Sequence, residues 1–323
     1  MSLDLSIVVP LFNEDESLPE LAEWIDRVCT EHNYRYEVIM VDDGSTDKSW
    51  QVIQQLSAQY PTINGIRFQR NYGKSAALNE GFKASKGNVV ITMDADLQDS
   101  PDEIPELYRM IIAEGFDLVS GWKKVRHDNA VTKNLPSKLY NAVNRRISGI
   151  KLHDMNCGLK SYRSKVVKSI EVYGEMHRFI PVLAKAAGFR KIGEKVVVHR
   201  ARKYGVSKFG WERFVNGFLD LLSVTFITRF GKKPMHFFGF WGSFIFLISL
   251  ISFIYLTVER LLTGPAYGLT SKPLFYITLI SMVLGTQFFL AGYIAELISR
   301  SAPDRNHYLI EEKAGFRDEK KDN

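Results

Sequence analysis

Two aspartates, Asp94 and Asp96, are separated by a single residue and follow the apolar run 89–93 directly. In an extended segment their side chains point the same way, so both carboxylates can converge on one divalent cation and bridge it to a diphosphate. A solvated acidic turn explains Asp99 and Asp102, whereas charge that emerges from a buried run is costly unless it is compensated. The spacing therefore predicts a metal site at Asp94 and Asp96.

Polar residues also follow two earlier apolar runs, at 10–14 and at 42–47. Acids at strand ends can accept hydrogen bonds from a base or a ribose, and Gly44 allows the backbone to turn tightly beside a ligand. A plain helix N-cap is the alternative interpretation for Asp43 and Ser45. Both segments are therefore candidate contacts for a nucleoside.

The segment 70–75 is similar to part of a phosphate-binding P-loop, but that motif needs a glycine where Phe68 stands. The sequence has no G-x-G-x-x-G motif either, so nothing indicates a dinucleotide-binding Rossmann fold. Arg70 and Lys74 remain candidate contacts to phosphate or base, with solvated surface cations as the alternative.

Short β-branched runs alternate with amphipathic stretches in the first part of the chain. This alternation is typical of an α/β fold, and almost wholly apolar runs predict central parallel strands covered on both faces. The functional loops of such a sheet lie at the C-terminal ends of its strands, where the polar motifs occur. After residue 121 the alternation is less regular, with a strand-like run at 194–199. The expected strands are 5–9, 36–41, 63–68, 89–93 and 117–120.

Composition excludes several classes of protein. Charged residues make up 24% and hydrophobic residues 46% of the chain, which rules out a disordered, collagenous or disulfide-scaffold protein. The formal net charge of +6 fits phosphate ligands or an anionic membrane surface as well as nucleic acid. Cys29 and Cys157 form no C-x-x-C pair, so neither a zinc site nor a disulfide framework is indicated, and a reducing compartment is expected.

Apolar residues are concentrated toward the C-terminal end, where 235–258 and 273–295 carry no charge. As helices, both runs would cross the roughly 30 Å hydrocarbon core of a bilayer, so we expect a transmembrane hairpin rather than buried core helices. Cations flank the outer ends of the pair and the N-terminal run lacks the features of an export signal, which predicts that both ends are cytoplasmic. The flanking cations are Arg229, Lys232, Lys233, Arg300 and Arg305.

The segment 211–230 places its apolar residues close to one helical face. We expect this helix to lie in the membrane interface, and an ordinary amphipathic core helix is the alternative. The charge-balanced residues after 301 predict an extension without chemistry.

Taken in order, these motifs resemble those of glycosyltransferase family 2. More narrowly, the chain resembles the polyprenyl-phosphate (dolichyl-phosphate) glycosyltransferases through 153–163 and the R-x-x-G-x-S-K stretch 202–208, and the likeness covers about residues 5 to 300. It implies a GT-A catalytic domain with a Rossmann-like mixed sheet, followed by interfacial helices and the two-helix hairpin. The Q-x-x-R-W motif of processive synthases is missing, which favours transfer of a single sugar. The motifs that carry the resemblance are Asn13-Glu14, Asp42-Asp43-Gly44-Ser45, Arg70-Asn71-x-Gly73-Lys74 and Asp94-Ala95-Asp96-Leu97-Gln98.

The resemblance also implies roles for single residues. Asp96 would hold an Mg²⁺ or Mn²⁺ ion, with help from Asp94 and Gln98, and the ion would stabilise the leaving diphosphate. Asp154 is the acceptor-side carboxylate, either as a base or by positioning, since a phosphate acceptor is already mostly dianionic near neutral pH. The implied catalytic residues are Asp94, Asp96 and Asp154, the donor-binding residues are Pro10, Asn13, Glu14, Asp42, Asp43, Lys74, Asp94 and Ala95, and the residues that bind the acceptor or its phosphate are Arg202, Ser207 and Lys208.

The expected enzyme is thus an inverting hexosyltransferase of the inner (cytoplasmic) membrane that moves one sugar from a nucleotide-diphosphate sugar to polyprenyl phosphate, for cell-envelope glycans. UDP-glucose is the first candidate donor, and GDP-mannose stays open. The alternatives are an anchored transferase with a polysaccharide or protein acceptor, and an inactive nucleotide-sugar-binding scaffold. Expected partners are both substrates, the membrane and a second copy of the chain, without nucleic acid. The expected organisation is a cytoplasmic catalytic domain at 1–209, an interfacial helix at 210–234, two transmembrane helices within 235–299 and a cytoplasmic tail at 300–323.

Overall fold

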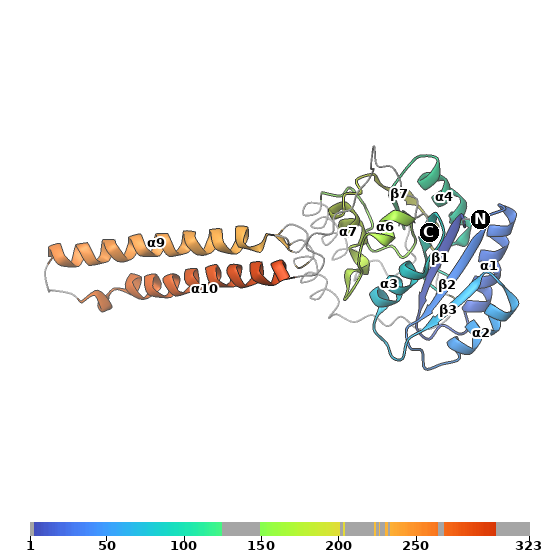
Figure 1. Cartoon of the computed structure of the whole chain (residues 1–323), viewed down its shortest axis with the longest axis horizontal. Coiled ribbons are helices and arrows are strands. Elements are labelled where there is room, and N and C mark those ends of the chain that lie inside the picture. Colours follow the sequence, from blue (N-terminus) through green and yellow to red (C-terminus); the bar gives the residue numbers. More distant parts are fainter. Residues whose placement is uncertain are drawn as a thin grey trace, which may run out of the picture. The chain divides into compact units, whose positions relative to one another are not determined.

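Figure 1 shows the computed structural model of the chain, which describes residues 3–124, 149–200, 233–263 and 268–301 and the single positions 203, 223, 226, 230 and 231. Two compact units make up the chain, Met1–Thr225 and Phe226–Asn323. The predicted interfacial helix 210–234 and the tail 300–323 lie almost wholly outside the described residues, so the predicted domain boundaries stay predictions.

The N-terminal unit is built on one seven-stranded sheet with the strand order β3-β2-β1-β4-β6-β5-β7. β1 to β4 run parallel, whereas β6 runs antiparallel to both of its neighbours, β4 and β5, and β7 pairs in parallel with β5. This is the mixed sheet of the expected α/β class. The strands are β1 Leu5–Leu11, β2 Tyr36–Asp42, β3 Ile63–Arg67, β4 Val89–Thr92, β5 Leu118–Trp122, β6 Lys160–Arg163 and β7 Ile192–Val196.

Helices cover both faces of this sheet, and Figure 1 shows α1 and α3 on opposite sides of the parallel strands. β1 is buried along its whole length, because Leu5, Ile7 and Val9 pack against α1 and α4 while Val8 packs against α3. Proline stands at the start of α1, α4 and α7, where its missing N–H has no partner to lose. The helices of this unit are α1 Leu18–Glu31, α2 Ser49–Gln59, α3 Lys74–Ala84, α4 Ile104–Ile112, α6 Ser164–Lys168 and α7 Ile180–Ala186, with 3₁₀ turns η1 Pro101–Glu103 and η2 Met176–Arg178.

Two strands differ from the expectation. The sequence does not predict β6, because its short run is mostly polar, yet this strand pairs on both sides in the middle of the sheet. The strand-like run 194–199 is confirmed only in part, because β7 ends at Val196. Beyond it, His199 forms an isolated antiparallel β-bridge with Asp99.

The C-terminal unit contains two long helices, α9 Pro234–Thr263 and α10 Pro273–Ser301, with the 3₁₀ turn η3 Leu269–Ser271 in the link. By length and composition both could cross a membrane, since their most apolar stretches have mean hydropathies of 2.1 and 1.8. Only 17% and 11% of these stretches are buried. A soluble core helix would be mostly buried, so the exposed apolar surface favours lipid as its surroundings.

The two long helices approach closely where two glycines face each other. A β-carbon on Gly242 would lie 2.6 Å from the backbone nitrogen of Phe289, and one on Gly285 would lie 2.8 Å from the backbone nitrogen of Phe246. Glycine at both positions lets the two backbones touch, which is the packing that small residues provide between membrane helices.

Candidate active site

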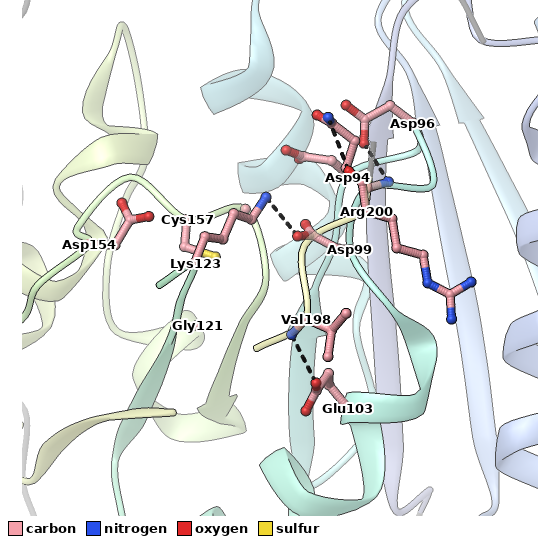
Figure 2. Close-up of polar contacts among 12 residues, drawn as sticks. Asp94, Asp96, Asp99, Glu103, Gly121, Lys123, Asp154, Cys157, Val198 and Arg200 are labelled. Carbon is pink, nitrogen blue, oxygen red and sulfur yellow. Dashed lines mark hydrogen bonds and ion pairs between the residues drawn. The ribbon is translucent and has the colours of Figure 1, made fainter. Parts of the chain in front are cut away.

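Asp94 leaves the carboxyl end of β4 as a half-buried carboxylate (Figure 2). It forms an ion pair with Lys74, the first residue of α3, and a β-carbon at Gly158 would lie 2.5 Å from its Oδ2. Burial alone would raise the pKa of Asp94, but the charges of Lys74, Lys123 and Lys160 lower it to about 2. Asp94 is therefore a fixed anion at neutral pH.

Asp96 lies on the same turn and is 7% exposed. Its Oδ1 accepts a hydrogen bond from the backbone N–H of Gln98 at 3.2 Å, and Leu97 between them turns the chain with a positive φ of 60°. Within the described ranges, no three His, Cys, Asp or Glu side chains gather closely enough to hold a metal ion. Two carboxylates and an amide still offer hard oxygen ligands, so an Mg²⁺ or Mn²⁺ ion that keeps waters or diphosphate oxygens would fit this turn.

The two candidate nucleoside segments are joined by hydrogen bonds. The backbone N–H of Asn13 donates to Ser45 Oγ at 2.9 Å, and Asn13 Oδ1 accepts from the backbone N–H of Thr46 at 2.8 Å. Asp42 Oδ1 accepts from the backbone N–H of Ser45 at 2.8 Å, while the N–H of Glu14 donates to Ser49. Hydrogen bonds therefore join the two segments that carry the predicted donor residues, at the carboxyl edge of the sheet.

Asp43 does not cap the helix that follows it, because α2 begins only at Ser49 and has no side-chain cap. Its two carboxylate oxygens accept from the backbone N–H groups of Tyr72 and Gly73, at 2.7 and 2.9 Å. Burial raises the pKa of Asp43, and these two hydrogen bonds oppose the rise. Asp43 therefore fixes the turn that presents Lys74, which corrects the N-cap alternative.

Glycine is required at position 44 for the same turn. Gly44 has a φ of +71°, and a β-carbon there would lie 2.5 Å from the backbone carbonyl carbon of Arg70. The exposed guanidinium of Arg70 lies 4.2 Å from the ring centre of Tyr72 and bonds weakly to the carbonyl of Asn71. The structure therefore gives Lys74, and not Arg70, a place beside the Asp94 carboxylate.

Asp154 lies on the loop before β6 and is 3% exposed. Its Oδ1 accepts from the backbone N–H of Asn156 at 3.2 Å, and its own carbonyl accepts from the Ser120 hydroxyl at 3.2 Å. In Figure 2, Lys123 and Cys157 lie between Asp154 and the Asp94 turn. The structure thus brings the predicted acceptor-side carboxylate to the same part of the molecule as the donor-side pair. The other predicted acceptor residues, Arg202, Ser207 and Lys208, lie outside the described residues.

Asp99 is not the solvated residue that the sequence suggests. It is 1% exposed, and its Oδ1 lies 2.8 Å from the ammonium of Lys123 (Figure 2). Burial raises the pKa of Asp99, and the Lys123 charge opposes the rise. Gln98 and Arg200 are also joined, by a backbone hydrogen bond of 3.0 Å. The turn that carries Asp96 is therefore anchored at its far end to β5 and to the chain beyond β7.

His177, which sequence reasoning did not single out, lies against the first turn of α3, beside Lys74. Its backbone N–H donates to Ser75 Oγ at 3.0 Å, and its Nδ1 lies 3.0 Å from the same hydroxyl. Ser75 is 1% exposed and has no other acceptor among the described residues, so its hydroxyl hydrogen donates to Nδ1 and the ring proton stays on Nε2. Burial and the charges of Lys74 and Arg178 hold the pKa of His177 well below 6.5, so the ring is neutral at pH 7.

This neutral histidine predicts a pH dependence of stability. Below pH 6.5 the unfolded chain protonates His177 before the folded chain does, so acid favours unfolding. The free energy of unfolding should therefore fall by up to about 1.4 kcal/mol per pH unit through this group, and His177→Gln should remove that slope. Thermal unfolding of both proteins between pH 5 and 7.5 measures the difference, and parallel curves would contradict the assignment.

Residues 6–171 match the domain described as glycosyl transferase family 2. Over 93% of its length the chain is 36% identical to the dodecaprenyl-phosphate galacturonate synthase of Rhizobium johnstonii, of which it covers 89%. Over 95% of its length it is 34% identical to the undecaprenyl-phosphate 4-deoxy-4-formamido-L-arabinose transferase of Shewanella sediminis, of which it covers 92%. The chain therefore belongs to glycosyltransferase family 2 and is a glycosyltransferase, as its ordered motifs predict.

A solved structure supports the fold. The glucosyl-3-phosphoglycerate synthase of Mycobacterium tuberculosis, in complex with Mg²⁺ and uridine diphosphate, superimposes with a TM-score of 0.54 at 19% identity, over 70% of this chain and 79% of that one. The mixed sheet is thus the GT-A fold, which confirms the predicted fold class. Two apolar helices long enough to span a membrane follow it, as expected.

Proposed function

We propose that this transferase moves one sugar from a nucleoside-diphosphate sugar to polyprenyl phosphate at a membrane surface. The observation that supports it best is the contact between two parts of the site. Gly158, on the loop of the acceptor-side carboxylate Asp154, lies against the carboxylate of Asp94 on the donor-side turn. The apolar helices α9 and α10 suit a lipid substrate, and both relatives named above carry a polyprenyl phosphate in their names.

In the proposed reaction an oxygen of the acceptor phosphate attacks the anomeric carbon of the donor sugar. The bond from that carbon to the nucleoside diphosphate breaks, so the configuration inverts and the nucleoside diphosphate leaves. A bound Mg²⁺ or Mn²⁺ ion would offset the charge of the leaving group. Asp94 and Asp96 with Gln98 would hold this ion, while Lys74 orients Asp94.

Asp154 would position the acceptor rather than remove its proton, because a phosphate monoester is mostly dianionic near pH 7. Arg202, Ser207 and Lys208 stay predicted phosphate contacts. The catalytic unit and both chain ends are proposed to be cytoplasmic, from the cations that flank the hairpin. Self-association stays a prediction.

For the donor we propose UDP-galacturonate ahead of the predicted UDP-glucose. The support is the 36% identity with a galacturonate synthase. UDP-galactose is a matched control, since it differs from UDP-galacturonate only by a hydroxymethyl group in place of the carboxylate.

The test is whether the purified full-length protein transfers radiolabelled sugar from a nucleotide-sugar donor to extractable undecaprenyl phosphate. The donors are UDP-galacturonate, UDP-galactose, UDP-glucose and GDP-mannose, each with Mn²⁺ and then with excess chelator. Labelled lipid that disappears on chelation supports the proposed reaction and its metal. No labelled lipid with any donor, despite nucleotide-sugar binding, contradicts the acceptor, and equal labelling from UDP-galactose and UDP-galacturonate contradicts the donor choice.

A further inference from the structure

Three polar residues form a row across the sheet beneath the site. Lys160 on β6 stands directly opposite Thr92 on β4 and Ser120 on β5. Residues opposite one another on neighbouring strands point to the same face of a sheet. The row therefore presents two hydroxyls and one ammonium to the loop that comes just before β6.

Each member of the row donates a hydrogen bond to a different carbonyl of that loop. The hydroxyl of Ser120 donates to the carbonyl of Asp154 at 3.2 Å, and that of Thr92 donates to the carbonyl of Gly158 at 2.8 Å. The ammonium of Lys160 donates to the carbonyl of Cys157 between them. The row thus holds both ends of the segment 154–158, which carries the acceptor-side carboxylate and the glycine that touches Asp94.

The ammonium of Lys160 is an unusual member of this row, because the residue is 3% exposed. Among the described residues, no carboxylate forms an ion pair with this ammonium. Its hydrogen-bond partner there is the neutral carbonyl of Cys157. The charged groups that act on it are Asp94 and Asp154, which attract it, and Lys74, which opposes it, while the Cys157 thiol and the neutral His177 ring are the other titratable groups around it. Burial, the largest influence, lowers the pKa of Lys160.

A buried charge without an ion-pair partner weakens a fold, and an apolar side chain of similar shape often restores stability. Thr92 and Ser120 already hold the two ends of the loop. A neutral side chain at position 160 would therefore stabilise the fold about as well as the charged lysine does. The charges of the donor-side and the acceptor-side carboxylates both act on it, which gives it an electrostatic role instead. It can offset the repulsion between these two anions when both substrates are bound.

On this basis, and resting on the proposed function, we propose that Lys160 is a positioning residue for sugar transfer. Its buried ammonium holds the loop 154–158 in register and is the shared counter-charge of Asp94 and Asp154. Lys160 touches neither substrate. It acts through its hydrogen bond to the carbonyl of Cys157 and through the electrostatic field of its positive charge.

The test is Lys160→Met in the full-length protein, which keeps an unbranched side chain one atom shorter and removes the charge. We expect kcat for transfer to undecaprenyl phosphate to fall at least about tenfold, as for other residues that orient a site from behind. The dissociation constant of UDP with Mn²⁺ should change less than about twofold, and the Tm should stay equal or rise. A purely structural lysine would instead lower the Tm and the activity together.

Lys168 on α6 provides a matched control. Its ammonium also donates to backbone carbonyls, those of Phe82 and Lys83, at 2.6 and 2.8 Å. These carbonyls belong to the C-terminal end of α3, whereas Lys74 at its N-terminal end faces the site. Lys168→Met should therefore leave kcat unchanged and lower the Tm.

The variants Thr92→Val and Ser120→Ala each remove one hydroxyl donor of the row. Each should reduce kcat less than Lys160→Met does, because each leaves the charge in place. An unchanged kcat in Lys160→Met, or a fall in Tm that matches the fall in kcat, or a variant that does not fold, overturns the proposal. Wild-type protein that transfers no sugar to the lipid overturns the proposed function, and this inference with it, whereas wild-type transfer with an unaffected Lys160→Met overturns the inference alone.

Discussion

Replacing Asp96 with asparagine should reduce sugar transfer by about a thousandfold. The substitution keeps the shape of the side chain and an oxygen that can still accept the hydrogen bond from Gln98, so the turn is preserved. It removes one of the two carboxylates able to hold a divalent cation, and loss of that charge stabilisation in the transition state is worth several kcal/mol. About 4 kcal/mol corresponds to the expected thousandfold loss.

The effect should appear in metal binding as well as in turnover. Binding of Mn²⁺ to the protein with UDP, followed by electron paramagnetic resonance, should weaken in Asp96→Asn. Asp102→Asn is a suitable control, because Asp102 lies nearby on η1, is 53% exposed, and bonds to Trp24 and Ser100 instead. Asp102→Asn should keep both the wild-type affinity for Mn²⁺ and the wild-type rate of sugar transfer. Wild-type turnover in Asp96→Asn would sink the assignment of this turn as the metal site.

The parallel half of the fold could be predicted from the sequence because β1, β2 and β4 are short, mostly apolar runs that each end in a polar motif. The Asp94 and Asp96 pair follows β4 in this way, and the structure finds both residues on the turn that leaves it. Local pattern is enough here, since a buried parallel strand and its functional end are encoded by adjacent residues. The family resemblance gave the same order of motifs.

The sequence misled where a side chain is paired with a distant part of the chain. Asp99 has the local pattern of a solvated turn, yet its partner Lys123 comes from the end of β5. Asp43 has the spacing of a helix cap, yet it binds the amides that lead into α3. Such contacts depend on which strands are neighbours in space, and local spacing carries no information about that.

Lys160 shows the same difficulty in a stronger form. A lysine at the start of a short polar run indicates an exposed loop, because a buried lysine without an ion-pair partner is rare. Only the insertion of β6 between β4 and β5 explains its burial. The sequence offers one indication that Lys160 belongs to the site. It lies two residues after Gly158, within the stretch 153–163 that carries the family resemblance.

Gly158→Ala should lower transfer by about a hundredfold with only a modest loss of stability. A β-carbon at this position would lie 2.5 Å from Oδ2 and 2.7 Å from Cγ of Asp94, which is closer than any real contact. Asp94 has a short side chain and its Oδ1 pairs with Lys74, so it cannot turn away without breaking that ion pair. Either the carboxylate or the loop must shift, and a shift of about 1 Å can cost a hundredfold in rate.

The cause of this loss can be separated from a general effect of adding a methyl group. Gly115, at the turn before β5, has a φ of +73°, and among the described residues a β-carbon there would meet only the ends of the Arg163 and Lys191 side chains, at 3.3 and 3.7 Å. Gly115→Ala should therefore cost about 1–2 kcal/mol of stability through backbone strain and leave transfer unchanged. Gly158→Ala should show the opposite pattern, because its strain falls on Asp94, a carboxylate of the proposed metal site. The measurements are kcat and Tm for both variants. Equal losses of kcat would show that sugar transfer does not depend on the close contact between the loop of Asp154 and Asp94.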